Sequence, residues 1–143
     1  MLRSSRKRIA FDLDETLGVP VIEGVEIVGF RFRDGCAELL QRLEKDFDLI
    51  LWTVSNRSYV EKILAFGLKK FFVETYSWND ISTSWKDVRR IKADFLIDDS
   101  THHFEEAVKK GISEHYIVIE PFGSPKDFEN PLYWIEQIEE VLF

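Results

Sequence analysis

The sequence predicts an α/β protein with a doubly wound, mostly parallel sheet of five strands. Five short apolar runs recur along the chain, and segments with helical periodicity lie between them. The runs are apolar throughout, as expected of parallel strands that are buried on both faces. Strands that alternate with helices in this way form a parallel sheet with helices on its faces.

The strands are expected at 8–13, 48–53, 71–76, 94–98 and 116–120. Helices are expected where apolar residues recur at intervals of three and four. The four sets are Cys36-Leu39-Leu40-Leu43-Phe47, Val60-Ile63-Leu64, Phe104-Ala107-Val108 and Ile135-Ile138-Leu142. Gly67 and Gly111 follow two of these helices, where a left-handed residue is favoured. The N-caps are expected at Ser55 or Asn56 and at Ser100 or Thr101.

One segment, 18–32, interrupts the alternation between the first strand and the first helix. Its sequence, GVPVIEGVEIVGFRF, is β-prone and is punctuated by Gly24 and Gly29, which predicts a short β-hairpin flap. We expect its valines and isoleucines to pack on the domain, and the charged residues Glu23, Glu26, Arg31 and Arg33 to face outward. No large cap domain is expected, and residues 1–143 are predicted to form a single domain.

Composition restricts the functional class. The chain has 143 residues, 45% of them hydrophobic, and a net charge of −7, which disfavours strong nonspecific binding to nucleic acid. The basic N-terminus (1–8) is interpreted as a solvated lead-in, because no apolar signal segment follows it. No run could cross a membrane. The single cysteine, Cys36, favours a reducing, cytoplasmic location. We expect a monomer with no membrane partner.

The candidate site begins at the end of the first strand, in IAFDLDETL. Asp12 and Asp14 follow the apolar run Ile9–Phe11 and, if extended, point to one face. Two neighbouring carboxylates raise each other's pKa unless a cation neutralises them. The side chain of Asp12 and the backbone carbonyl of Asp14 could bind Mg2+, which prefers oxygen ligands.

Polar residues also follow the second and fourth strands. Ligands of open α/β sheets bind beyond the carboxyl ends of the strands. Thr53, Val54 and Ser55 follow the second strand and precede a helix N-terminus, which can hold an anion. Asp98 and Asp99 follow the fourth strand. The converging carboxylates require a basic partner, for which Lys86 is the candidate, with Arg89, Arg90 and Lys92 as alternatives.

Four segments, in order, resemble the haloacid dehalogenase superfamily of Rossmann-like phosphotransferases. They are FDLDETL, FRDGCAELLQRLEKDFDLILWTVSNRSYV, Lys86-Asp87 and LIDDS. Within that superfamily the chain is most similar to the small phosphatases related to those acting on the RNA polymerase II C-terminal domain. It differs from them in a shorter flap and in THHFEEAVKKG after Asp99, where they tend to have Asn-Ser-Pro.

The resemblance implies a Mg2+-dependent phosphatase that forms an aspartyl-phosphate. It implies that Asp12 is the nucleophile, Asp14 the acid and base, and Thr53 the phosphate-binding hydroxyl. The Val54 amide and Ser55 would help to bind the phosphate, and Lys86 would neutralise its charge. Asp98 and Asp99 would join Asp12 and Asp14 at the metal, with Asp99 the more direct ligand and Asp98 orienting Lys86 or a metal-bound water.

Other functions fit the sequence less well. Cys36 and Arg42 match the Cys-x5-Arg spacing of cysteine phosphatases, but the glycine-free helical segment between them cannot cradle a phosphate. A zinc site at His102, His103 and Asp99 is disfavoured because adjacent helical residues point about 100° apart; a solvent-exposed pair is preferred. A weak or inactive binding module and a small-metabolite phosphatase remain alternatives. The open site suits a large substrate, such as a phosphoprotein or a nucleic-acid end.

Overall fold

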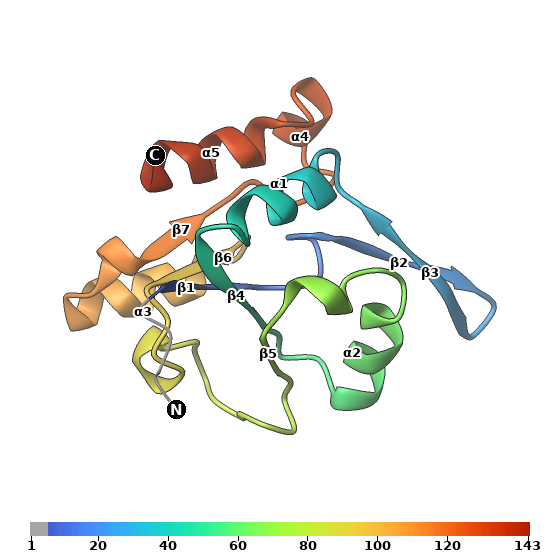
Figure 1. The fold of residues 1–143 in the computed structure, drawn as a ribbon, viewed down its shortest axis with the longest axis horizontal. Helices are drawn as coiled ribbons and strands as arrows, with labels where there is room; N and C mark the ends of the chain where they lie inside the picture. Colours follow the sequence, from blue (N-terminus) through green and yellow to red (C-terminus); the bar gives the residue numbers. More distant parts are fainter. Residues whose placement is uncertain (1–5) are drawn as a thin grey trace.

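The computed structural model describes residues 6–143 and contains the predicted five-stranded sheet (Figure 1). The strands are β1 (Lys7–Phe11), β4 (Phe47–Trp52), β5 (Glu74–Tyr76), β6 (Phe95–Asp98) and β7 (Tyr116–Val118). Their order is β5-β4-β1-β6-β7, and all neighbours are parallel. Strand β1 is therefore central, with β4 on one side and β6 on the other. Most of the predicted N-terminal lead-in, residues 1–5, lies outside the described residues.

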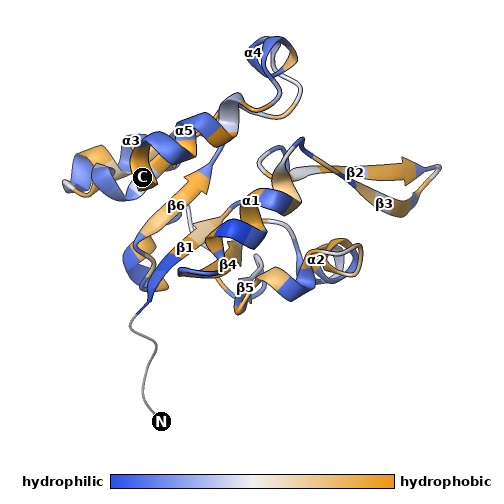
Figure 2. Cartoon of the chain, turned by 45° about the horizontal axis from the view of Figure 1, so that its top comes forward, coloured by the Kyte–Doolittle hydropathy of each residue, from blue (hydrophilic) through white to orange (hydrophobic). Residues whose placement is uncertain are grey.

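Each face of the sheet carries its own apolar core. Side chains of a strand alternate between faces, so Ile9 and Phe11 belong to one core and Ala10 to the other. Helices α1 (Cys36–Leu43), α2 (Arg57–Leu64) and α5 (Tyr133–Leu142) contribute to the first core. Helix α3 (His102–Lys110) and the 3-10 turn η2 (Val88–Arg90) contribute to the second. Figure 2 shows the apolar strands between helices with polar outer faces.

Two local expectations were wrong, and two short elements had not been predicted. Phe47 does not extend the first helix but begins β4, after a turn at residues 44–46. The predicted strand at 71–76 is reduced to β5, because Phe71 ends the 3-10 turn η1 (Lys69–Phe71) and packs in the core. The short helix α4 (Pro125–Glu129) and the 3-10 turn η3 (Ser113–His115) had not been predicted. Short turns lack enough periodicity to be detected.

The expected helix ends are largely present. Asn56 is the N-cap of α2, and its side chain accepts a hydrogen bond from the Tyr59 amide at 2.9 Å. Ser100 Oγ accepts a hydrogen bond from the His102 amide at 3.2 Å at the start of α3. Gly111 ends α3 in the left-handed conformation, with φ of 74°. No helix among residues 6–143 is long and apolar enough to span a membrane.

The predicted flap is an antiparallel hairpin of β2 (Gly18–Glu23) and β3 (Glu26–Phe32). It leaves the loop after β1 and projects beyond the sheet (Figure 1). Its apolar contacts with the core include Phe30, which is buried, and Ile27, which lies near the turn and is partly buried. The expected apolar contact with the domain was wrong for four other side chains, which are exposed: Val21, Ile22, Val25 and Val28. The two strands form a two-stranded sheet of their own, separate from the five-stranded sheet.

Candidate active site

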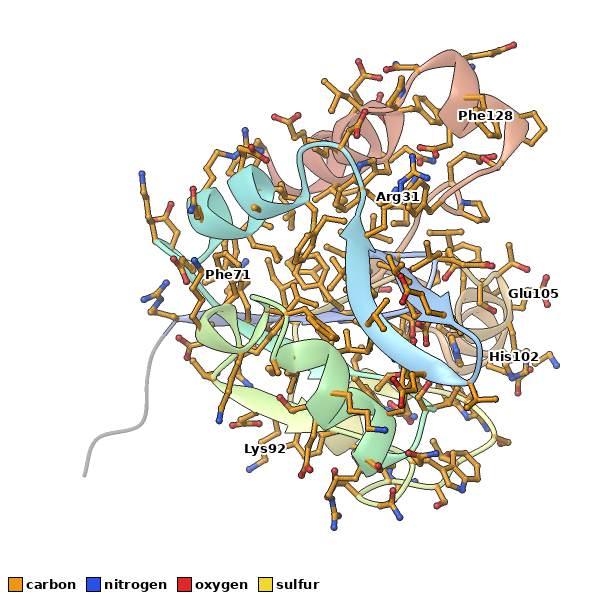
Figure 3. All side chains as sticks on the ribbon, turned by 90° about the vertical axis from the view of Figure 1, so that its right-hand side faces the viewer. Arg31, Phe71, Lys92, His102, Glu105 and Phe128 are labelled. Carbon is orange, nitrogen blue, oxygen red and sulfur yellow. The ribbon has the colours of Figure 1, made fainter. Side chains whose placement is uncertain are left out.

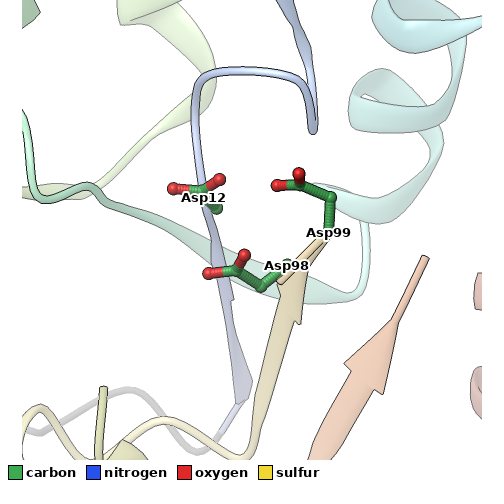
Figure 4. A group of neighbouring side chains, drawn as sticks. All are labelled: Asp12, Asp98 and Asp99. Carbon is green, nitrogen blue, oxygen red and sulfur yellow. The ribbon is translucent and has the colours of Figure 1, made fainter. Parts of the chain in front are cut away.

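Three carboxylates meet at the carboxyl edge of the sheet, as Figure 4 shows. Asp12 directly follows β1, Asp98 ends β6, and Asp99 is the next residue. The two strands are neighbours in parallel register, and the Asp12 amide donates a hydrogen bond to the Ile97 carbonyl at 3.0 Å. One carboxylate oxygen from each of the three residues lies within 4.8 Å of the others. This oxygen-only group has the chemistry of a site for a hard divalent cation.

Lys86 lies against two of these carboxylates. Its side chain is 2% exposed, and its Nζ donates hydrogen bonds of 2.9 Å to Asp12 Oδ1 and to Asp98 Oδ2. Burial lowers the pKa of Lys86, but the two carboxylates outweigh burial, so that the pKa is raised and the ammonium stays charged. The alternatives Arg89, Arg90 and Lys92 are exposed, and Arg89 pairs with the adjacent Asp87. The structure thus brings Lys86 to the site.

The charge of the cluster is only partly neutralised. Burial raises the pKa of Asp98 despite the ammonium of Lys86 beside it. Burial and the neighbouring charges of Asp12 and Asp98 raise the pKa of Asp99 to about 7. Three carboxylates facing one ammonium therefore leave excess negative charge, which a divalent cation would offset.

Thr16 connects the two sides of the cluster and was missed in the sequence. Its buried hydroxyl lies 3.2 Å from Asp12 Oδ2 and 3.0 Å from Asp99 Oδ1, and its oxygen accepts a hydrogen bond from the Asp99 amide. The position of Thr16, four residues after Asp12, was visible in the sequence. The turn that brings its side chain back to the cluster was not.

Asp14 points away from the carboxylate cluster, toward the start of α2. Ser55 Oγ donates a hydrogen bond of 3.2 Å to Asp14 Oδ2, and the Tyr59 hydroxyl donates one to Asp14 Oδ1. Burial raises the pKa of Asp14, and the hydrogen bond from Tyr59 opposes that rise. The side chain of Asp14 is thus outside the group that could hold a metal, which leaves only its backbone carbonyl for that role. Tyr59 had not been predicted.

The segment between β4 and α2 lies beside Asp14. Thr53 is buried at the end of β4, and its Oγ1 accepts a hydrogen bond from the Ser55 amide at 3.1 Å. The Thr53 hydroxyl remains able to donate its own hydrogen to an anion. The side chain of Val54 is exposed, so any contribution of Val54 to phosphate binding would come from its backbone amide.

His103 is a third residue whose place at the site the sequence did not reveal. Its Nδ1 accepts a hydrogen bond from the Lys86 amide at 2.9 Å, and its Nε2 lies 3.7 Å from Asp98 Oδ2. Burial lowers the pKa of His103 to about 4, which keeps the imidazole neutral at physiological pH. The expectation of a solvent-exposed pair was wrong for His103, although His102 is exposed and contacts the Ser84 carbonyl. The two rings have different partners, which does not support a zinc site.

Cys36 also lies outside the site. It is buried at the start of α1 within the apolar core, and burial raises the pKa of its thiol to about 12. Arg42, the second residue of the Cys-x5-Arg match, instead pairs with Glu139 on the surface. The geometry gives no support to a thiolate phosphatase.

Comparison with protein families adds the decisive observation. The model for NLI interacting factor-like phosphatases matches residues 7–132. The chain belongs to this family. It is therefore a phosphatase of the haloacid dehalogenase superfamily, as the motifs predicted. Comparison with the sequences of curated proteins gave no significant match.

Solved structures share the fold of this NLI interacting factor-like phosphatase. The RNA polymerase II CTD phosphatase Fcp1 aligns with a TM-score of 0.65 and 18% identity over 96% of this chain and 51% of that chain. Fission yeast Fcp1 bound to beryllium fluoride aligns at 0.60 and 15% identity, over 95% of this chain and 50% of that chain. A Thermotoga maritima protein described as a beta-phosphoglucomutase aligns with a TM-score of 0.64 and 15% identity. The alignment covers 95% of this chain and 100% of that chain. The phosphatase spans about half the length of the Fcp1 chains.

Proposed function

We propose that this phosphatase is a Mg2+-dependent phosphomonoester hydrolase that works through an aspartyl-phosphate on Asp12. The observation that carries the proposal is the position of Asp12. Its carboxylate contacts Lys86 on one side and Thr16 on the other, next to Asp98 and Asp99. A nucleophile surrounded by one cation and an oxygen-only metal group suits attack on a charged phosphate.

The residues fit a magnesium ion. Asp12, Asp98 and Asp99 offer hard oxygen ligands, and the pKa of Asp99 is raised by its burial and by the neighbouring charges of Asp12 and Asp98. We propose that Asp12 and Asp99 hold the ion, with the backbone carbonyl of Asp14. Asp98 would mainly orient Lys86, from which it already accepts a hydrogen bond. When bound, Mg2+ would neutralise charge on the oxygens of the transferring phosphoryl group.

Two carboxylates would divide the chemistry. Asp12 would attack the phosphorus, while Asp14 would donate a proton to the leaving oxygen. Asp14 would then take a proton from the water that attacks the phosphorus of the aspartyl-phosphate and releases inorganic phosphate. The raised pKa of Asp14 supports the first role, because a larger fraction of the carboxyl is protonated. Lys86, the Thr53 hydroxyl, Ser55 and the Val54 amide would position the phosphoryl oxygens.

A large substrate, with a phosphoprotein as the first candidate, is proposed for the site. The described residues include no large cap domain, and the hairpin beside the site carries exposed apolar side chains. The similarity in fold to Fcp1, a phosphatase of the RNA polymerase II CTD, agrees with a protein substrate. The net charge of −7 weighs against a nucleic-acid end.

The chemistry is tested with an aryl phosphate. Hydrolysis should require Mg2+, stop with chelator, and fall about a thousandfold or more in Asp12→Asn, a loss of roughly 4 kcal/mol. The matched control is Asp46→Asn, because Asp46 is exposed in the turn before β4. Acid quenching should trap phosphate on the wild type and not on Asp12→Asn. Equal rates with Mg2+ and chelator would reject the metal, and a fully active Asp12→Asn would reject the covalent step.

Substrate class is tested with a panel of phosphopeptides, 3′- and 5′-phosphorylated oligonucleotides, nucleotides and sugar phosphates. We expect the highest kcat/KM for a phosphopeptide. A preference for sugar phosphates or nucleotides would instead support a small-metabolite phosphatase. No hydrolysis of any compound, with Mg2+ present, would favour a binding module.

A further inference from the structure

A buried ion pair lies behind the loop that carries the catalytic carboxylates. Arg33, between β3 and α1, was expected to face outward, but its side chain is 1% exposed. Its Nη2 donates a hydrogen bond of 3.0 Å to Asp127 Oδ1 in helix α4. Its Nη1 reaches the carbonyls of Glu15 and Thr16 at 3.3 and 3.4 Å. A single guanidinium therefore joins the C-terminal part of the chain to the residues that follow Asp14.

Arg33 is packed between aromatic rings, and its burial removes a charged group from water. Its guanidinium lies over the ring of Trp134 at 4.7 Å and near that of Phe122 at 5.8 Å. Its Nε is buried and has no hydrogen-bond partner among residues 6–143. Burying a charge in this way is unfavourable unless a partner offsets it. An apolar residue could fill the position of Arg33 with a smaller loss of solvation free energy. Packing alone therefore does not explain why a charged pair occupies this position.

The pair acts on an unusual backbone position. Glu15 is exposed and has a φ of 65°, a left-handed conformation that disfavours a glutamate. Its carbonyl accepts hydrogen bonds from Arg33 and from the Phe122 amide, the latter at 2.8 Å, while its own amide donates to the Gly18 carbonyl. Asp127 completes the arrangement by accepting a hydrogen bond from the Gly123 amide at 2.9 Å. Contacts from the C-terminal segment thus fix Glu15 in this conformation.

The conformation of Glu15 sets the directions of its two neighbours. Asp14 precedes it and points to Ser55 and Tyr59, whereas Thr16 follows it and points to Asp12 and Asp99. A relaxed backbone at Glu15 would rotate both side chains away from these partners. Misplacing a catalytic group by about 1 Å can cost roughly a hundredfold in rate.

We infer that Arg33 and Asp127 form a positioning pair that holds the backbone at Glu15 and thereby orients Asp14 toward the leaving group of the substrate. The inference rests on the proposed role of Asp14 as the general acid. It makes Arg33 and Asp127 positioning residues, because neither touches the carboxylate cluster itself.

The test compares two aryl phosphates in the full chain. Phenolate is a poorer leaving group than p-nitrophenolate and depends more on protonation by the acid. Asp127→Asn keeps the size of the side chain and removes its charge. We expect Asp127→Asn to lower kcat/KM for phenyl phosphate about tenfold and that for p-nitrophenyl phosphate less than about threefold. Arg33→Lys should give the same pattern, because lysine cannot reach both Asp127 and the carbonyls.

The control is the exposed ion pair between α1 and α5, Arg42 Nη2 to Glu139 Oε2 at 3.2 Å. Arg42→Lys and Glu139→Gln should leave both substrates unchanged. Equal losses on the two substrates in Asp127→Asn would overturn the positioning role, since a general loss of folded enzyme lowers both rates alike. An inactive wild type would instead overturn the proposed function, and this inference with it.

A second-site variant tests the backbone step directly. Asparagine adopts the left-handed conformation more readily than glutamate. Adding Glu15→Asn to Asp127→Asn should therefore raise kcat/KM for phenyl phosphate at least about threefold above that of Asp127→Asn alone. If Glu15→Asn recovered nothing while the double variant stayed folded, the pair would not act through this backbone.

Discussion

At the scale of single residues, the site depends on groups that hold the reactive carboxylates as much as on the carboxylates. Lys86 is held through its ammonium by Asp12 and Asp98 and through its amide by His103. Asp14 is held by two hydroxyl groups, from Ser55 and Tyr59. Loss of the Lys86 ammonium should lower the rate, whereas loss of a hydrogen bond to Asp14 should shift the pH dependence of the rate.

Lys86→Met tests the buried ammonium. Methionine matches the shape of lysine but leaves Asp12 and Asp98 without a cation, and it removes the positive charge from the phosphate site. We expect activity at saturating Mg2+ to fall at least about a hundredfold, consistent with the loss of one buried charged contact. Lys45→Met, at an exposed turn, is the matched control and should retain full activity. A loss smaller than about threefold in Lys86→Met would exclude a role for the ammonium in catalysis.

Tyr59→Phe tests the support of Asp14. The Tyr59 hydrogen bond lowers the pKa of Asp14, so its removal should raise that pKa. The acid must be protonated to act, and the alkaline limb of kcat/KM should therefore move to higher pH. The measurement is a pH profile with phenyl phosphate, with Tyr133→Phe in α5 as the control. An alkaline limb that stayed in place or moved to lower pH would argue against Asp14 as the acid.

At the scale of elements, the edge of the sheet brings the chemistry together and the hairpin adds a surface beside it. The carboxyl ends of β1, β4 and β6 carry Asp12, Thr53 and Asp98, and the isolated bridge between Asp14 and Gly18 places the hairpin base at the same edge. Val25 at the tip is 99% exposed. Exposed apolar side chains next to an active site are suited to contact with a large substrate.

A shortened hairpin tests this role. Pro20 and Phe30 are direct cross-strand partners, so an Asn-Gly turn can replace residues 21–29 without loss of the buried Phe30. Aryl phosphate hydrolysis should stay within about tenfold, roughly 1.4 kcal/mol, while the preferred large substrate loses far more.

A full-length control separates shape from apolar contact. Threonine at the four exposed apolar positions keeps the strand propensity of the hairpin and removes much of its apolar surface. Those positions are Val21, Ile22, Val25 and Val28. The threonine variant should lose activity on the large substrate only. Equal losses on both substrates in the shortened variant would mean that the hairpin supports the catalytic geometry instead.

At the scale of the whole molecule, the excess charge of the site opposes folding. In the folded protein the pKa of Asp99 is about 7 against 3.8 for a free carboxyl, so the folded state holds a proton that the unfolded chain has released. Asp99 therefore stabilises the metal-free protein at low pH, and the free energy of unfolding should fall as the pH rises from 3.8 toward 7. A cation bound by the carboxylates would reverse this loss.

Magnesium should consequently stabilise the protein more at pH 7.5 than at pH 5. Metal binding requires ionised carboxylates and stabilises only the folded state. The measurement is urea unfolding with Mg2+ and with chelator at both pH values. In Asp99→Asn the difference between the two pH values should shrink. The same stabilisation by Mg2+ at both pH values would contradict the charge assigned to Asp99.

The sheet, its neighbouring helices and the approximate position of the site could all be predicted from local patterns in the sequence. Continuous apolar runs identify buried strands, and acidic residues directly after them have to lie at the carboxyl edge, because parallel strands end there together. This reasoning reached Asp12, Asp98 and Thr53 without knowledge of strand order. Lys86 could be named only as one of several basic residues, because loop residues have no periodicity that gives their direction.

The side chains that support the site could be identified only from the folded structure. Thr16, Tyr59 and His103 reach their partners through a tight turn or across separate helices, and local sequence patterns do not encode such contacts. Arg33 was misplaced for the same reason. A charged residue after a strand is expected in solvent unless a carboxylate distant in sequence is brought to it, and Asp127 lies 94 residues away. Long-range packing therefore determines the geometry of the active site, whereas the local pattern of apolar and acidic residues determines where in the fold the site lies.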